Sequence, residues 1–447
     1  MKQVLVIGLG YVGLVQLLGC ADRDKSSRYE FTGMDSNKQR IEDLKNGKLP
    51  IHEEGLQEVL DRNLEKIHFI TSEELIGQKC DIVFSCVGTP MAEDGSSDMS
   101  YVSAVADLFA ETQRDDCLFV NKSTCPVGTC DIISDEIGHP ERVISNPEFL
   151  QEGIALKNFN FPDRIVIGGK RNQDLKQFYE DLGFENIMLM KTCKEAEMIK
   201  YASNTILAVR VALINEMAEF CEVNDIDIDN VLNGIWADKR IGSTFYHPGP
   251  GYGGSCFPKD VESLFYQSGN TMWIVGATIE SNLAQCDKLS NVLTHAVHPL
   301  ENVTLGIVGA AFKDGTDDMR NSQADLILDN IYSSEYLKDR ISKIRLYDAC
   351  MNEHMWRYVQ ESICGQPIPI ETTNTITDLK DCDIVIVINI QDPDKELLLK
   401  MLTDSLCDKY VIDARMHIPI DIIEKRPGKY WGIGRGSHND LYDPWSF

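Results

Sequence analysis

Short runs of aliphatic and β-branched residues, each ending at a glycine turn, occur near the start of the chain and again some three hundred residues later. Val4–Ile7 leads into Gly8, and Val303–Val308 leads into Gly309. A second apolar run follows each junction at a matched distance: Cys80–Phe84 and Cys382–Ile386. A strand, a glycine turn, a helix and a later buried strand are typical of a doubly wound α/β unit. The pattern predicts two such domains of similar construction.

Between these halves the hydrophobic period changes to that of a helix. From Glu195 to Val223 the chain has neither proline nor glycine, and apolar residues recur every three or four positions. These are Ile199, Ala202, Ile206, Val209, Leu213, Met217 and Phe220. At a rise of about 1.5 Å per residue the span makes a helix roughly 43 Å long. Such a helix suits a spine that joins two domains or packs against a copy of itself, which favours a homodimer or a higher homo-oligomer.

The changes of pattern predict three parts. They are residues 1–194, a central helical dimerisation region over 195–300, and residues 301–447. The expected fold class is therefore α/β, with two Rossmann-like doubly wound domains joined by a long central helix.

Charge and cysteine usage narrow the class of protein. Lys plus Arg number 43 and Asp plus Glu number 70, so a net charge of −27 disfavours nucleic acid and anionic membranes as partners. No apolar run approaches the roughly 20 residues of a membrane span, and the N-terminus lacks a signal-peptide pattern. The 14 cysteines include no C-x-x-C pair, which is typical of reduced thiols and argues against a metal site. We expect a cytoplasmic protein.

The first glycine turn reads Gly8-Leu9-Gly10-Tyr11-Val12-Gly13, a G-x-G-x-x-G fingerprint directly after a predicted strand. Its glycines allow a tight turn, close approach of a pyrophosphate and helix–strand packing. Asp35 follows a second predicted strand, Tyr29–Met34, and would accept hydrogen bonds from ribose hydroxyls while repelling a 2′-phosphate. The fingerprint predicts NAD as cofactor, and a glycine turn that serves packing alone is the alternative.

Residues 249–260, GPGYGGSCFPKD, carry the strongest sign of chemistry. Four glycines leave backbone N–H groups bare to wrap a ligand. Pro258 suits the first turn of a helix, so Cys256 would lie at a helix N-terminus beside Lys259, and both features lower the pKa of a thiol. We interpret Cys256 as a nucleophile, although most cysteines are small buried hydrophobes.

Three further segments carry weaker signals. Lys200 and Asn204 share one face of the predicted central helix, and Glu148 and Glu152 would share a face if their segment were helical. The simpler interpretation is that both the Lys200–Asn204 pair and the Glu148–Glu152 pair are solvated surface residues. Residues 123–129 form a hydroxyl-bearing turn after a predicted strand, near the sheet edge where ligands bind in such folds.

Taken together, the motifs resemble one family, the NAD-dependent nucleotide-sugar dehydrogenases of the UDP-glucose/GDP-mannose dehydrogenase type, over essentially the whole chain. The matching stretches are GLGYVG at 8–13, LPIHEEGL at 49–56, STCPVGT at 123–129, NPEFLQEG at 146–153, KYASN at 200–204, DKRIGSTFYHPGPGYGGSCFPKD at 238–260 and FKDGTDDMRNS at 312–322. The family architecture agrees with the predicted boundaries.

The resemblance implies a twofold oxidation of the C6 alcohol of UDP-glucose to UDP-glucuronate, with two NAD reduced per turnover. It implies that Cys256 captures the intermediate aldehyde as a thiohemiacetal, and that a second oxidation leaves a thioester which water hydrolyses.

The resemblance also assigns roles to groups around that thiol. Lys200 and Asn204 correspond to the pair that stabilises oxyanions. Asp260, with Thr124 through a water, corresponds to the proton acceptor, and Glu148 corresponds to the base for thioester hydrolysis.

The expected ligand contacts form two sets. Cofactor contacts are expected from Gly8, Gly10, Tyr11, Val12, Gly13, Asp35, Arg40, Thr89, Thr124, Glu152, Lys259 and Arg320. Substrate contacts are expected from Glu148, Phe149, Leu150, Glu152, Lys200, Asn204, Phe245, Tyr252, Gly253, Phe312, Lys313 and Arg415, with Arg240 reaching in from a partner subunit.

Two alternatives stay open at this point, a GDP-mannose dehydrogenase and a non-catalytic NAD-binding assembly protein. GDP-mannose dehydrogenases share the thiol chemistry, although residues 240–242 and 162–165 favour the UDP-glucose branch. Dehydrogenases of UDP-N-acetyl sugars usually have histidine in place of Ser255 and lack the lysine at 259, which argues against them. A non-catalytic NAD-binding assembly protein would lose the cysteine or the central lysine, and both are present.

Overall fold

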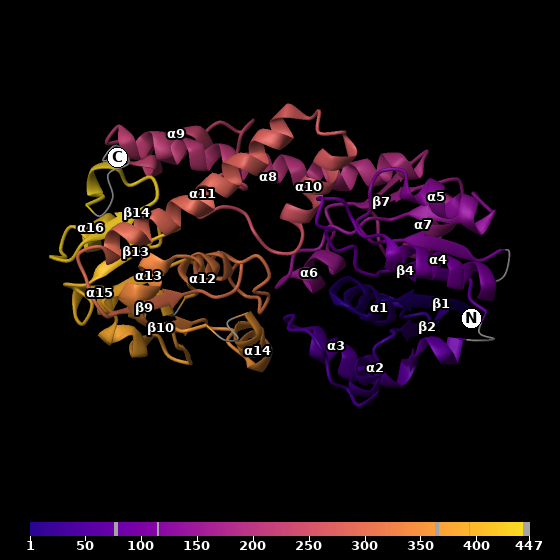
Figure 1. Ribbon diagram of the computed structural model, residues 1–447. Coiled ribbons are helices and arrows are strands. Elements are labelled where there is room, and N and C mark those ends of the chain that lie inside the picture. The colour runs from indigo at the N-terminus through magenta and orange to yellow at the C-terminus, as the bar shows by residue number, and fades with distance from the viewer. Residues whose placement is uncertain (76–78, 114–115, 363–365, 393, 441–447) are drawn as a thin grey trace. The chain divides into compact units, whose positions relative to one another are not determined.

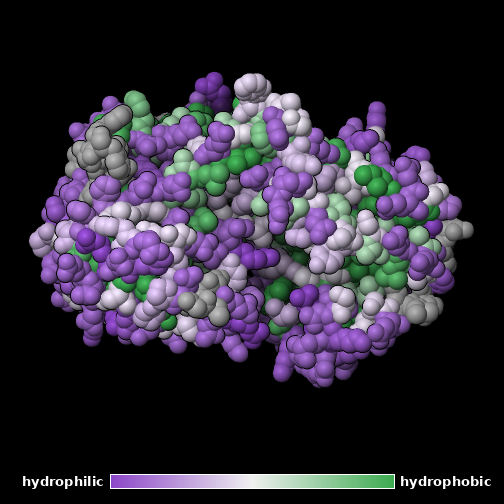
Figure 2. Space-filling view, viewed as in Figure 1, coloured by the Kyte–Doolittle hydropathy of each residue, from purple (hydrophilic) through white to green (hydrophobic). Residues whose placement is uncertain are grey.

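The computed structural model describes residues 1–440 except 76–78, 114–115, 363–365 and 393. The chain divides into two compact units, whose elements are labelled in Figure 1. The first unit comprises Met1–Asn204 and Glu262–Gly269, and the second comprises Thr205–Val261 and Asn270–Phe447. Hydrophilic residues cover most of the face seen in Figure 2, as the high charge requires.

The first unit is built on an eight-stranded sheet of order β3-β2-β1-β4-β5-β6-β7-β8. Neighbouring strands are parallel except β6 and β7, which pair antiparallel. The strands are β1 (Lys2–Ile7), β2 (Tyr29–Met34), β3 (Ile67–Ile70), β4 (Ile82–Ser85), β5 (Leu118–Asn121), β6 (Val143–Ser145), β7 (Ile165–Gly168) and β8 (Ile187–Met190).

Helices cover both faces of this sheet. On β1, Val4 and Val6 belong to one hydrophobic cluster while Leu5 and Ile7 belong to another, because successive side chains of a strand point to opposite faces. The covering helices are α1 (Tyr11–Arg23), α2 (Lys38–Lys45), α3 (Leu56–Asn63), α4 (Ser100–Thr112), α5 (Thr129–Ile137), α6 (Ala155–Asn160) and α7 (Asn172–Asp181).

The second unit holds a six-stranded parallel sheet of order β11-β10-β9-β12-β13-β14. Its strands are β9 (Val303–Val308), β10 (Ile341–Tyr347), β11 (Ile370–Thr373), β12 (Ile384–Val387), β13 (Tyr410–Asp413) and β14 (Tyr430–Gly432). Its helices are α9 (Ile228–Trp236), α11 (Trp273–Val297), α12 (Gln323–Ser333), α13 (Glu335–Arg340), α14 (Glu353–Ser362), α15 (Asp394–Thr403) and α16 (Ile420–Ile423). In both sheets the first strand is an interior strand and the chain adds strands on either side of it, so the prediction of two doubly wound domains is confirmed.

Two helices contribute residues to both units. Helix α8 spans Cys193–Val223, which confirms the long helix predicted from Glu195 onward, and α10 spans Phe257–Gln267. Over the part of the chain that the structure covers, no helix is long and apolar enough to cross a membrane. Within the same residues, no group of histidine, cysteine and acidic side chains is arranged to hold a metal ion.

Candidate active site

The glycine fingerprint forms the turn between β1 and α1. Gly8 has a φ of 89°, a left-handed conformation that favours glycine. A Cβ on Gly13 would overlap the carbonyl oxygen of Gly8, whereas a Cβ on Gly10 would meet nothing within 4 Å. Packing therefore accounts for Gly8 and Gly13 but not for Gly10, whose bare backbone suits a pyrophosphate at the start of α1, where Tyr11 and Val12 lie.

Asp35 lies just after β2, and its buried carboxylate faces this turn. The carboxylate accepts hydrogen bonds from the N–H of Leu9 at 2.8 Å and from the N–H of Asn37 at 2.8 Å. Arg40 on α2 places Nη1 3.0 Å from Asp35 Oδ2. A fixed carboxylate here can accept from ribose hydroxyls and repels a 2′-phosphate, so these residues fit NAD.

Thr89 and Thr124 follow the neighbouring strands β4 and β5, and hydrogen bonds join the two loops. Thr89 Oγ1 donates to the carbonyl of Thr124 at 2.8 Å, and Ser123 Oγ donates to the carbonyl of Val87 at 2.7 Å. Since β1, β4 and β5 are adjacent, both threonines lie at the sheet edge where the glycine turn begins.

Lys200 and Glu148 form a buried ion pair in the first unit. Lys200 Nζ lies 2.9 Å from Glu148 Oε1, with side chains 5% and 8% exposed, and the N–H of Leu150 donates to Glu148 Oε2 at 2.6 Å. Burial alone would raise the pKa of the Glu148 carboxyl, but the Lys200 ammonium and the Leu150 N–H outweigh it and hold that pKa below its usual value. Glu148 is thus an ionised, buried carboxylate, and Asn204 lies buried one helical turn from Lys200.

The segment that carries Glu148 follows β6 and is not helical, so the helical spacing considered for Glu148 and Glu152 does not apply. Glu152 lies in the turn before α6. The ring of Phe149 has the Lys200 ammonium 5.4 Å from its centroid and the Arg164 guanidinium 4.0 Å from it.

Glu53, from the LPIHEEGL stretch, is a buried carboxylate that sequence reasoning missed. It accepts a hydrogen bond from the hydroxyl of Tyr11. The N–H of Gly153 donates to Glu53 Oε2 at 2.9 Å and to the Tyr11 hydroxyl at 2.8 Å, and the N–H of Leu156 donates to Glu53 Oε1 at 3.1 Å. Glu53 therefore ties the glycine fingerprint to the turn that holds Glu152.

In the second unit, Cys256 immediately precedes α10, as predicted for a thiol at a helix N-terminus. The N–H of Asp260 donates to the carbonyl of Cys256 at 2.9 Å. Among the cysteines that the structure describes, Cys256 is the exposed one, and the others are buried or half-buried. Lys259 Nζ lies 2.6 Å from Oδ1 of the buried Asp260, so the predicted cofactor lysine and proton acceptor are ion-paired neighbours.

Three buried amides on the long helices hold the glycine-rich loop, and sequence reasoning missed all of them. Asn215 on α8 accepts from the N–H of Gly249 at 2.8 Å, and Gln285 on α11 donates to the Gly249 carbonyl at 2.8 Å. Asn282 accepts from the N–H of Tyr252 at 2.7 Å and donates to its carbonyl at 3.1 Å. In the sequence, an amide side chain on an otherwise apolar face of a helix was the sign that could have indicated this role.

The predicted substrate residues Phe312 and Arg415 contact this loop. A Cβ on Gly254 would lie 2.8 Å from the ring of Phe312, and one on Gly249 would lie 3.5 Å from Arg415 Nη1. Burial lowers the pKa of the Arg415 guanidinium, and its Nε has no hydrogen-bond partner among the described residues. A half-buried cation with an unbonded nitrogen favours an anionic ligand. Lys313 Nζ lies 5.6 Å from the Phe312 centroid.

The remaining predicted residues also belong to the second unit. Arg240 is 89% exposed and bonds to Asp238 Oδ2 at 2.6 Å, and Arg320 bonds to Asp318 Oδ2 at 2.6 Å. Phe245 has a φ of 61°, and its ring centroid lies 5.8 Å from that of Phe257. A Cβ on Gly253 would overlap the carbonyl of Asn321, so close packing requires that glycine.

Comparison with known proteins shows the family of the chain. The sequence matches the UDP-glucose/GDP-mannose dehydrogenase family over its NAD binding domain (residues 2–182), its central domain (194–283) and its UDP binding domain (306–419). The chain belongs to this family. It is therefore an NAD-dependent oxidoreductase, and the predictions of family and cofactor are confirmed.

Individual relatives and a solved structure are members of the same family. The chain is 38% identical over 385 residues to the UDP-glucose 6-dehydrogenase of Pseudomonas aeruginosa, covering 81% of this chain and 83% of that one. It is 32% identical to UDP-glucose 6-dehydrogenase YwqF of Bacillus subtilis, covering 97% of each chain. A solved UDP-glucose dehydrogenase from Pyrobaculum islandicum superposes with a TM-score of 0.81 at 29% identity, covering 97% of this chain and 98% of that one.

Proposed function

We propose that this chain oxidises the C6 alcohol of UDP-glucose to the carboxylate of UDP-glucuronate, through a covalent intermediate on Cys256. The observation that carries the proposal is the exposed thiol of Cys256, which lies at the start of α10 and follows a glycine-rich loop fixed by buried amides. The relatives named above are UDP-glucose dehydrogenases, and NAD when bound supplies the hydride acceptor for each oxidation.

In this proposal, different residues of the chain carry out the successive steps of the reaction. Asp260, ion-paired with Lys259, takes the proton of the C6 hydroxyl. The Cys256 thiolate adds to the aldehyde carbon and forms a thiohemiacetal, which the second oxidation turns into a thioester. Lys200 and Asn204 donate to the oxygen that carries negative charge. Glu148, ionised beside Lys200, then takes a proton from the water that cleaves the thioester.

The diphosphate has a fitting cradle in the second unit. Arg415 is half-buried beside Gly249, and its Nε is unbonded within the described residues, so an anion would supply the missing partner. Lys313 adds a second cation next to Phe312. These local charges offset the repulsion expected between a nucleotide diphosphate and a chain with a net charge of −27.

A panel of nucleotide sugars tests the substrate assignment. UDP-glucose is expected to give two NADH per sugar, measured by absorbance against sugar consumed, and UDP-glucuronate by mass spectrometry. GDP-mannose, the alternative within the family, is expected to be a far poorer substrate. Preferential turnover of GDP-mannose, or one NADH per sugar, would reject the proposal.

Cofactor choice is predicted to depend on Asp35. Asp35→Ser removes the carboxylate that repels a 2′-phosphate and frees Arg40, now 3.0 Å from it, to bind that phosphate. We expect the preference for NAD over NADP in kcat/KM to narrow by about tenfold or more, the scale of one charged hydrogen bond. Glu42→Gln on the exposed face of α2 is the control. An unchanged preference in Asp35→Ser would show that other residues select the cofactor.

We further propose that the chain acts as a homodimer through α8. Ile206, Leu213, Met217 and Phe220 repeat along one stripe of this helix, and the structure leaves all four exposed, Phe220 by 63%. Figure 2 shows hydrophobic side chains gathered where Figure 1 labels α8 and α11. A stripe of this kind is typical of a helix covered by a partner. The side chain of Arg240, paired with Asp238, is 89% exposed, and in this proposal it serves the neighbouring subunit's site.

The dimer is tested by Phe220→Asp, which places a charge in the stripe. We expect the variant to become monomeric by light scattering and to lose activity while its thermal unfolding transition remains, because a monomer lacks the partner's Arg240. Leu397→Asp puts the same charge on an exposed leucine of α15 and should change neither property. A fully active monomer would reject the shared site.

A further inference from the structure

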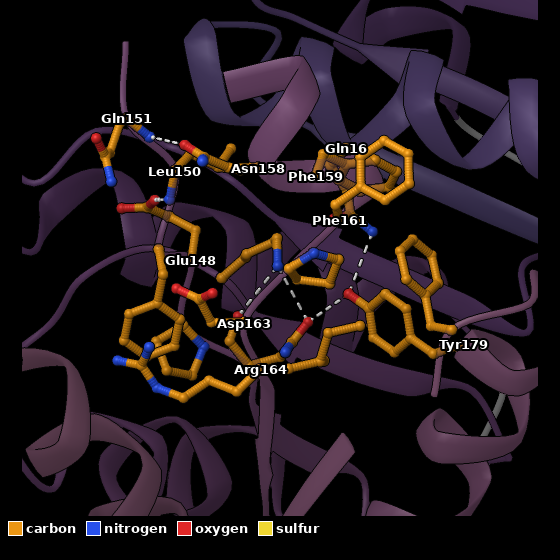
Figure 3. Close-up of a pocket in the computed structure, with 17 residues that line it drawn as sticks. Gln16, Glu148, Leu150, Gln151, Asn158, Phe159, Phe161, Asp163, Arg164 and Tyr179 are labelled. Atoms are coloured by element: carbon orange, nitrogen blue, oxygen red, sulfur yellow. Dashed lines mark hydrogen bonds between the residues drawn. The ribbon is translucent and has the colours of Figure 1, made fainter. Parts of the chain in front are cut away.

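A cavity of about 100 Å³ lies in the first unit among the segment 146–151, helix α6 and the start of β7. Figure 3 shows Gln16 and Tyr179 at one end of this cavity and Glu148 with Leu150 at the other. Asn158 on α6 belongs to its lining, whereas Asn160, two positions along the same helix, does not.

The end of the cavity away from Glu148 is polar and buried. Lys122 Nζ donates to Asn146 Oδ1 at 3.2 Å, and the Tyr179 hydroxyl donates to the same oxygen at 2.6 Å. Gln16 Nε2 donates to the Tyr179 hydroxyl at 3.3 Å, while Gln16 Oε1 has no hydrogen-bond partner among the described residues. Gln16 is 1% exposed, and a buried amide oxygen is seldom left unbonded. Gln16 therefore keeps an unused acceptor in the lining of the cavity.

Two charged side chains, Lys122 and Glu148, line the same cavity. Burial lowers the pKa of the Lys122 ammonium, and the nearby Glu148 carboxylate is among the groups that oppose this effect. Each carboxylate oxygen of Glu148 accepts one hydrogen bond, Oε1 from Lys200 and Oε2 from the N–H of Leu150. Each carboxylate oxygen has a second lone pair, so Glu148 can accept a further donor.

The cavity is large enough to hold water. Its volume of about 100 Å³ exceeds the roughly 10–15 Å³ that a single water molecule needs. An ordered water needs two to four polar partners. The ammonium of Lys122, the amide oxygen of Gln16 and the carboxylate of Glu148 supply donors and acceptors of the required kinds. Phe159 and Phe184 add apolar walls to the cavity.

We propose that this cavity holds the water that hydrolyses the thioester and delivers it to Glu148. The inference rests on the proposed function, because it extends the role of Glu148 as base. The oxygen of water bonds to the acyl carbon while Glu148 takes one of its protons. The C–S bond then breaks and its electron pair stays on Cys256 Sγ. The proton held by Glu148 passes to that thiolate, and the new carboxylic acid loses its remaining proton to solvent. No electron is transferred to or from a cofactor.

Two variants that remove the water site test the proposal. Gln16→Leu keeps a similar volume but removes the unbonded oxygen, and Asn158→Phe narrows the cavity from its lining. Asn160→Phe makes the same substitution on α6 outside the lining and is the matched control. Rapid-quench intact mass of UDP-glucose reactions measures the lifetime of the acyl adduct on Cys256, and NADH formation measures the two oxidations.

We expect Gln16→Leu and Asn158→Phe to lengthen the adduct lifetime by about tenfold, since an ordered water is lost, with the oxidations unchanged. Asn160→Phe should behave like the parent protein. Short adduct lifetimes in both cavity variants would overturn the proposal, as would equal slowing by Asn160→Phe. Glu148→Gln serves as reference for the proposed function. If it accumulates an adduct while the cavity variants do not, only the water route fails, whereas no adduct in any variant rejects the proposed function itself.

Discussion

Cys256→Ser is expected to reduce overall turnover of UDP-glucose by more than about 100-fold, the loss typical of a single positioned acid or base. In the proposed mechanism the thiolate adds to the aldehyde and so prepares the second oxidation, and a serine hydroxyl is a far weaker nucleophile at neutral pH. The second oxidation should suffer more than the first. Any ester formed slowly on the serine should accumulate, because esters of alcohols are poorer acyl donors to water than thioesters. Stopped-flow NADH traces and intact-protein mass measure both effects.

A matched control separates this role from general loss of a thiol. Cys407 is a half-buried cysteine of the second unit, and Cys407→Ser is expected to keep parent-like rates. Cys256 is exposed, so its replacement leaves no buried cavity and should keep the unfolding temperature. Parent-like turnover in Cys256→Ser would show that the nucleophile lies elsewhere.

Much of the fold could be predicted from the sequence because buried parallel strands are continuous apolar runs. Tyr29–Met34, Leu118–Asn121 and Val303–Val308 are strands at the bounds that their hydrophobic residues indicate. Helix α8 begins two residues before Glu195, within the usual fraying of helix ends. These elements are determined by local pattern alone.

The candidate site was predictable only where a motif carried it. Lys122 looks like an ordinary lysine after a strand, and its burial depends on Asn146 and Tyr179 from distant strands and helices. Likewise Asn215 and Asn282 look like surface amides until the loop 249–253 folds over them. The segment with Glu148 is not helical, and tertiary contacts hold it: Asn146 donates to the Val166 carbonyl, and Glu148 accepts from Lys200. Such tertiary contacts leave no periodic trace in the sequence.

Glu148→Gln is expected to separate hydrolysis from oxidation. The thiol of Cys256 still captures the aldehyde and two oxidations still occur, but the amide cannot take a proton from water. We predict a burst approaching two NADH per active site, followed by a steady state slower by about 100-fold or more. Intact mass should then show the sugar nucleotide attached to the protein. The adduct should vanish when Cys256 is also replaced, because the thioester needs its sulfur.

Loss of the Glu148 charge also leaves the buried Lys200 ammonium beside a neutral amide, so stability must be followed separately. Removing one partner of a buried ion pair costs about 3–5 kcal/mol. The unfolding temperature should therefore fall, while NAD binding, measured by fluorescence titration, shows that the first unit is still folded. Glu141→Gln replaces an exposed glutamate of that unit and should change neither the burst nor the stability. A steady state in Glu148→Gln as fast as in the parent protein would mean that another group activates the water. A burst of one NADH would instead place the block before the second oxidation, where Glu148 would act by holding Lys200 in position.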